Sequence, residues 1–141
     1  MNRRTDNTIY VTEDLIQRIL ERRPIRIGDY VNVFFPKETN EKQFDCAFKF
    51  LSTLEKQGHM TNSEVRNLFE SSNEKVMLVG HVIPKLIKFG LVETDAEAHS
   101  KRYNLYLSRK FTLVFRDFGL EWLEYYAKHK NDKPQLERNT Q

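Results

Sequence analysis

The stretch that decides the fold is "PKLIKFGLVETDAEAHSKRYNLYLS", residues 84–108. Its apolar residues first recur at helical spacing up to Gly90. Two short stretches, "LVET" and "YNLYLS", then flank the polar run "DAEAHSKR". Glycine often ends a helix because it adopts the positive φ angle that the closing turn requires. Two short strands around polar residues indicate a β-hairpin, so this stretch predicts a helix that leads directly into a hairpin.

Two helices are predicted near the start of the chain. The first lies in "VTEDLIQRILERRP" (11–24), with Thr12 as its N-cap and Pro24 as its end. The second lies in "EKQFDCAFKFLSTLEKQGH" (41–59), where apolar residues recur at three- and four-residue steps until Gly58. Between the two helices, "IRIGDYVNVFFP" alternates loosely and ends in proline. The pattern there leaves open whether the segment is a strand or an extended arm.

Two further helices are predicted before the hairpin. One begins at Thr61 or Asn62, and the next runs from Ser72 or Asn73 to Gly90.

The helix that ends at Gly90 contains two residues that oppose a regular helix. Gly80 costs about 1 kcal/mol relative to alanine, and Pro84 removes one backbone hydrogen bond. The sequence therefore leaves open a bend in this helix or a later start.

A long helix is predicted over 109–129, where Gly119 would allow a bend, and a polar tail follows it. Its aromatic residues recur on one face, with more apolar area than one edge of a small domain needs. The face either packs on the first helix, through Leu15 and Ile19, or forms a two-fold dimer seam, and we favour the dimer. The predicted dimer interface is Phe111, Phe115, Phe118, Trp122 and Tyr126.

Composition bounds the function. The 141 residues carry a net charge of +3 with a pI near 9.0, which permits a polyanionic partner without demanding one. The single cysteine, Cys46, lies among apolar residues and is expected to be a buried structural thiol. No apolar run approaches the roughly 20 residues of a membrane helix, so we expect a cytoplasmic protein that makes no membrane contact and is nucleoid-associated if the source is prokaryotic.

Residues 42–108 resemble the winged helix-turn-helix family, most specifically through "KLIKFGLVE". Here Leu86 anchors a helix, Gly90 ends it, and Leu91 and Val92 begin the next strand. The resemblance implies a mainly α fold with a small β-hairpin (α+β), with extra N- and C-terminal helices. It divides the chain into an N-terminal helix and extended arm (1–40), a winged-helix domain (41–108), a C-terminal helix (109–129) and a flexible tail (130–141).

The resemblance also implies a function. A recognition helix at about 73–89 would enter the major groove of duplex DNA, and a wing at about 95–102 would contact its flank. The chain would then be a dimeric DNA-binding transcriptional regulator. The implied DNA contacts are Asn73, Lys75, His81, Lys85, Lys101 and Arg102.

Two features of the sequence favour an alternative, a winged-helix module that binds another protein. The start of the implied recognition helix, "VMLVGHVIP", is apolar, and the wing carries Asp95 and Glu97. The arginines at 18–26 are interspersed with acids, which favours a balanced surface over a phosphate-binding track.

We predict no catalysis, cofactor or metal. The alternation of Glu93, Asp95, Glu97 and His99 lacks the glycine and terminal glutamate of a calcium loop. A solvated loop is the favoured interpretation.

Overall fold

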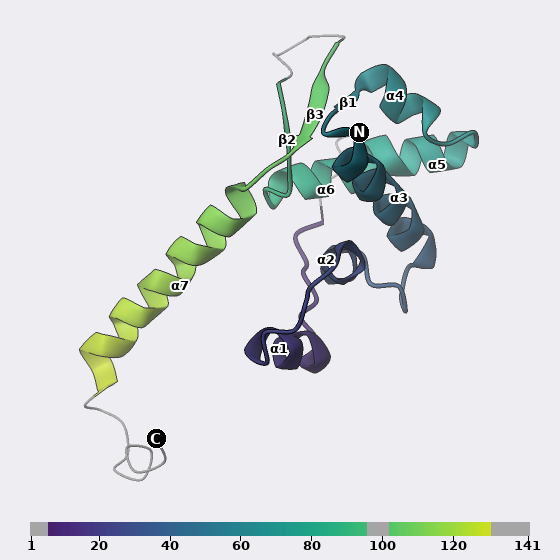
Figure 1. Ribbon diagram of the computed structural model, residues 1–141. Coiled ribbons are helices and arrows are strands. Elements are labelled where there is room, and N and C mark those ends of the chain that lie inside the picture. Colours follow the sequence, from purple (N-terminus) through teal and green to yellow (C-terminus); the bar gives the residue numbers. More distant parts are fainter. Residues whose placement is uncertain (1–5, 96–101, 131–141) are drawn as a thin grey trace.

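The computed structural model describes residues 6–95 and 102–130 (Figure 1). They form a mainly helical structure with one three-stranded antiparallel sheet, so the α+β class expected from the sequence is confirmed. The elements in chain order are α1 (Glu13–Leu20), α2 (Ile27–Phe34), α3 (Glu41–Gln57), β1 (Met60–Thr61), α4 (Asn62–Asn67), α5 (Ser72–Met77), the π-helical turn η1 (Leu78–Val82), α6 (Ile83–Lys88), β2 (Val92–Thr94), β3 (Asn104–Leu107) and α7 (Lys110–His129).

The segment between α1 and α3 contains a helix, so the predicted strand or extended arm is wrong. Ile27, Val31 and Phe34 follow one another at four- and three-residue steps and face the core, where the last two are fully buried. The Asp29 carboxylate accepts the Arg26 backbone N–H at 2.9 Å and so stabilises the helix start. Burial on α3 therefore outweighs the strand preference of the β-branched and aromatic residues.

Several predicted helix ends agree with the structure, although α1 ends at Leu20, before the predicted end at Pro24. The Thr12 hydroxyl accepts the N–H of Leu15 at 3.1 Å, and Thr61 forms a capping box with Glu64. Gly90 follows α6 with φ +83°. Any side chain there would also collide, because an added Cβ would lie 2.6 Å from the backbone nitrogen of Phe111. Gly90 thus ends α6, and its lack of a side chain lets the start of α7 pack closely against it.

The helix that leads into the hairpin has three parts: α5, the π-helical turn η1 and α6. The π-helical turn contains Gly80, and Pro84 lies in the first turn of α6, where its missing N–H costs least. The sequence left open a bend or a later start at these two residues. The structure instead contains a π-helical turn, in which the helix is locally wider.

The predicted hairpin is formed by β2 and β3, with Val92 opposite Leu107. The strand β1 pairs with the other edge of β3, with Met60 opposite Leu105, which gives the sheet order β1-β3-β2. Sequence patterns did not reveal β1, because two residues are too few to show alternation.

The core lies around α3, which packs against α2, α5 and η1. Cys46 is buried there as expected, and burial raises the pKa of its thiol to about 12. The largest fully buried apolar side chains are Phe34, Phe50, Leu51, Leu54, Met60, Leu78, Leu86 and Leu105.

Helix α7 projects away from the rest of the chain and runs without interruption through Gly119 (Figure 1). Its first turn is seated on the core, where Phe111 meets Phe34 edge-on with ring centroids 5.9 Å apart. Further along, Phe118 and Trp122 are 73% and 65% exposed, so α1 does not cover them. None of the described helices is both long enough and apolar enough to span a membrane.

Candidate nucleic-acid interface

The segment from α5 to α6 has one buried face and one exposed face. Leu78, Val82 and Leu86 point into the core, at the four-residue steps that keep side chains on one side of a helix. On the outer side, Asn73 and Val76 are exposed, and so is the backbone at Gly80. This outer face is the candidate surface for a groove of DNA or for a protein partner.

The predicted contacts on this segment have different surroundings. Asn73 and His81 are exposed, and Lys75 is partly buried. Val76 and Val79 are 56% and 44% exposed, so two valines contribute much of the outer face.

Lys85 is buried, so its predicted contact with DNA is wrong. Its side chain is 2% exposed, and Nζ donates to the carbonyl oxygen of Phe34 at 2.7 Å and to Asp6 Oδ2 at 2.9 Å. The ammonium also lies 5.2 Å from the ring centroid of Phe35. The hydrogen bond from Lys85 is the main cause that lowers the pKa of Asp6 to about 2. Lys85 therefore joins α6 to the end of α2 and to the N-terminal segment.

The spacing of the sequence contained the signal for this burial. Lys85 follows Leu78 by seven residues and Val82 by three, so it lies on the same face as both. The family resemblance implies a surface position for Lys85, and a lysine is in general expected there because charged residues are seldom fully buried. Its partners are 51 and 79 residues away in the chain, and no local pattern identifies them.

The wing is described only in part. Lys101, Glu97 and the middle of the loop lie outside the described residues, while Arg102 is exposed just before β3. Asp95 accepts both the backbone N–H of Asn104 at 2.7 Å and its side-chain amide at 3.0 Å. These bonds lower the pKa of Asp95 and fasten the hairpin where its strands diverge.

Two further exposed cations within residues 41–107 were not singled out from the sequence. Arg66 lies on α4 and Lys88 lies at the end of α6. Both belong to helices that the sequence did predict, but charged residues on exposed helix faces are too common to be distinctive.

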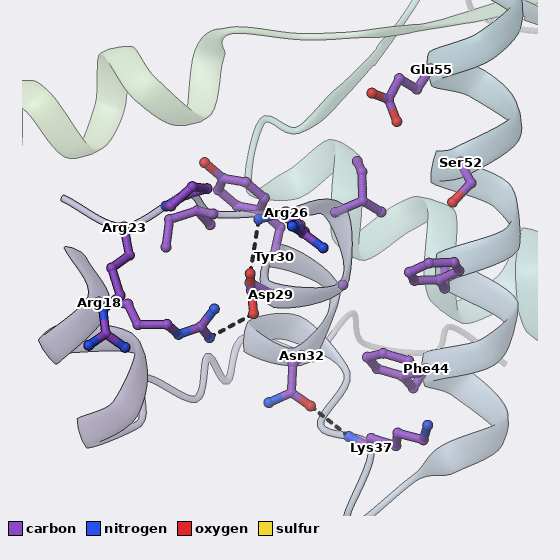
Figure 2. A pocket seen from close by; sticks show the side chains of 15 residues that line it. Arg18, Arg23, Arg26, Asp29, Tyr30, Asn32, Lys37, Phe44, Ser52 and Glu55 are labelled. Atoms are coloured by element: carbon purple, nitrogen blue, oxygen red, sulfur yellow. Dashed lines mark hydrogen bonds and ion pairs between the residues drawn. The ribbon is translucent and has the colours of Figure 1, made fainter. Parts of the chain in front are cut away.

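A hollow of about 1070 Å³ lies between the α1–α2 region and α3 (Figure 2). Figure 2 shows Arg18 reaching Asp29, at 2.7 Å, and Arg18 also bonds Asp14 at 3.1 Å. Arg23 pairs with Glu21 at 2.7 Å. Two arginines of this segment therefore pair with acids, as the expected balanced surface predicts.

The remaining wall of this hollow is partly aromatic. Phe44 and Phe48 stack with centroids 6.0 Å apart, and the Lys37 ammonium lies 5.4 Å from the Phe44 centroid. Because the cations here mostly bond to neighbouring acids or rings, no set of polar groups converges on an empty position.

Potential metal ligands do not gather at one place among residues 6–95 and 102–130. The described part of the chain contains no group of three or more His, Cys, Asp or Glu side chains placed to hold a metal ion. Of the alternating acidic residues in the hairpin loop, Glu93 and Asp95 are described, while Glu97 and His99 lie outside the described residues.

Comparison of the chain with protein-family models, with curated proteins and with solved structures finds no match.

Proposed function

We propose that the chain is a winged helix-turn-helix protein that binds duplex DNA as a transcriptional regulator and acts as a homodimer. The observation that carries the proposal is the connectivity of residues 41–107. The order is helix, short strand, two helical segments and hairpin, and the sheet order is β1-β3-β2. That arrangement leaves the outer side of α5 and η1 exposed at Asn73, Val76 and Gly80, while in α6 only Lys88 is exposed.

Exposed cations within residues 41–107 support a contact with phosphate. Arg66, Lys88 and Arg102 are exposed on α4, α6 and the strand edge. Lysine and arginine neutralise phosphates and release counterions, which gives affinity without sequence readout. Asn73, Lys75 and His81 are the predicted contacts on the implied recognition helix that remain as candidates for base contacts.

The test is fluorescence anisotropy of the full chain on random-sequence duplex DNA, titrated from low to physiological salt. We expect affinity that falls steeply with salt. The double variant Lys101→Ala with Arg102→Ala should weaken binding on all sequences and reduce the salt slope by roughly one for each phosphate that is no longer neutralised.

A matched control separates the wing from the overall charge. Arg22→Ala with Arg23→Ala removes the same charge from the segment after α1 and should leave the salt slope unchanged. Equal effects of the two double variants would show that only the net charge matters.

A protein-binding module is the second candidate, and the exposure of Val76 and Val79 favours it. Two valines on the outer face are poor readers of base edges but suit an apolar partner surface. Absence of DNA binding even at low salt would reject the first proposal in favour of this one. Under it, Val76→Ser with Val79→Ser should abolish partner capture.

A further inference from the structure

The outer part of α7 carries an aromatic stripe that nothing in the described chain covers. Phe118 and Trp122 are largely exposed, and so is Tyr125. Trp122 and Tyr125 stack on each other at 5.7 Å, yet both keep most of their surface in water. An exposed apolar surface of this kind marks an interaction site.

The spacing of the stripe indicates the shape of what covers it. Successive members are separated alternately by four and three residues, so the pattern repeats every seven residues, which is a period of 3.5. A repeat of this length keeps one seam facing a second helix that coils around the first. The members of the stripe are Phe111, Phe115, Phe118, Trp122, Tyr125 and His129. Tyr126, which the sequence placed in the dimer interface, is partly buried and falls outside this seven-residue repeat.

We propose that the covering helix is α7 of a second copy of this chain, packed antiparallel to the first. This inference rests on the homodimer of the proposed function and does not require DNA binding. A second copy presents the same stripe with the same repeat, so a two-fold arrangement covers both stripes and closes without leaving a free edge.

The direction follows from where α7 joins the rest of the chain. Phe111, the first member of the stripe, faces its own core, and its N–H bonds to the Gly90 carbonyl at 3.0 Å. A parallel partner would bring a second core to this same end and side of the helix. An antiparallel partner places the two cores at opposite ends of a helix pair about 30 Å long.

The repeat fixes the register. Antiparallel alignment of the stripe sets Phe118 beside Trp122 of the second copy, and Phe115 beside Tyr125 of the second copy. Gly119 then lies next to the two-fold axis. An added Cβ at Gly119 would meet nothing within 4 Å, so the backbones are free to approach each other there.

The same register places a side chain near a hollow at the base of α7. Thr112 lines this hollow of about 240 Å³ together with Ile27 and Tyr30 of α2. Tyr126 of the second copy lies within one helical turn of Thr112, so its ring can reach the mouth of the hollow. The rest of the lining is also mainly apolar, namely Leu51, Leu91, Leu107, Ser108 and Phe111.

The size of the interface fits a stable dimer. Large aromatic side chains bury about 150–250 Å² each. With part of Phe111 and Phe115 already covered, the two stripes bring together on the order of 1,000 Å². The hollow adds to this area and brings the interface near the roughly 1,200–2,000 Å² of specific complexes.

The first experiment is sedimentation velocity of the full chain over a range of micromolar concentrations. We expect the wild type to be a dimer. Phe118→Glu should raise the concentration needed for dimerisation at least a hundredfold. Leu120→Glu is the matched control, because Leu120 is also exposed but lies on another side of the helix. A monomeric wild type, or equal effects of the two variants, would overturn the proposal.

Trp122, the one tryptophan of the chain, gives a second readout. Its emission should shift to the blue as wild-type protein is concentrated and should stay constant in Phe118→Glu. Circular dichroism of Phe118→Glu should remain helical, because the side chain is exposed within one copy.

Disulfide trapping tests the direction and register. Gly119→Cys should form a covalent dimer on mild oxidation, whereas Ala127→Cys, on another side of α7, should not. The buried Cys46 serves as an unreactive background. A trapped dimer of Ala127→Cys, or none of Gly119→Cys, would contradict the antiparallel register.

DNA binding is measured separately on Phe118→Glu. Salt-dependent DNA binding by a wild type that stays monomeric would reject this inference and leave the DNA proposal standing. A wild-type dimer with no affinity for DNA would reject the DNA proposal and leave this inference standing.

Discussion

Helices α6 and α7 are separated only by the hairpin, yet they place opposite kinds of side chain in opposite surroundings. In α6, Lys85 is fully enclosed and bonded to Phe34 and Asp6. In α7, Phe118 and Trp122 stand in water. This difference shows that the exposure of a side chain on α6 or α7 depends more on what packs against the helix than on the polarity of the residue. Helix α6 packs against η1 and β2 and is tied to α2, whereas α7 is seated only at its first turn.

The largest effect is expected when one leucine side chain is truncated in each helix. Leu86→Ala in α6 should destabilise the protein by about 3–5 kcal/mol, because a fully buried leucine leaves a cavity. Leu120→Ala in α7 should change stability by less than about 0.5 kcal/mol. Urea denaturation at one fixed protein concentration measures both, since dimer unfolding depends on concentration. Similar losses would mean that α7 is covered in solution on that side too.

The second test compares two lysines of α6. Lys85→Ala should cost about 2–3 kcal/mol, because it leaves the Phe34 carbonyl without its partner and opens a cavity. Lys88→Ala should cost less than about 0.5 kcal/mol, since Lys88 is exposed.

The two variants Lys85→Ala and Lys88→Ala should rank in the opposite order when DNA binding is measured instead of stability. Well below its melting temperature, Lys85→Ala should bind duplex DNA as wild type does, while Lys88→Ala should bind more weakly. If folded Lys85→Ala selectively loses DNA binding, Lys85 is a groove contact after all.

The smallest expected effect concerns the acid that partners Lys85. The pKa of Asp6 is about 2 in the folded protein against 3.8 for a free aspartate. A lowered folded pKa means that the ion pair of Asp6 with Lys85 stabilises the fold fully above about pH 4, and that this stabilisation disappears as the pH falls through about 2. Asp6→Asn should therefore be less stable than wild type near neutral pH, by less than about 1 kcal/mol because Asp6 is largely hydrated.

Chemical denaturation of both proteins at several pH values checks this expectation. The difference in unfolding free energy should be constant near neutral pH and should shrink between about pH 4 and pH 2. A difference that is unchanged at low pH would show that the carboxylate does not act through its charge.

Much of the fold could be predicted from the sequence where the signals are local. Thr12 and Thr61 mark helix starts through their own hydroxyls, and Gly90 marks a helix end through its own backbone. Helix α2 was missed because its β-branched and aromatic residues suit a strand equally well. Its packing on α3 decides the matter, and that contact is not local.

The candidate site was less predictable than the fold. Spacing alone did not fix which face of the helical segment is covered, because Val76 and Val79 recur at helical steps with Val82 and yet are exposed. The placement of Lys85 on the covered face was overlooked, since lysine is usually a surface residue. Its anchoring depends on Asp6, which no pattern in residues 84–108 reveals.

The link between Asp6 and Lys85 also bears on how the chain folds as it is made. Asp6 leaves the ribosome first, but its partner is synthesised 79 residues later. At about 5–20 residues per second, that is a wait of roughly 4–16 seconds. Tyr10 can be fastened much earlier, because its N–H bonds to the Val33 carbonyl in α2 at 2.8 Å. Asp6 and the residues directly after it are therefore among the last parts to dock, and a nascent chain halted before residue 85 should leave them open to protease.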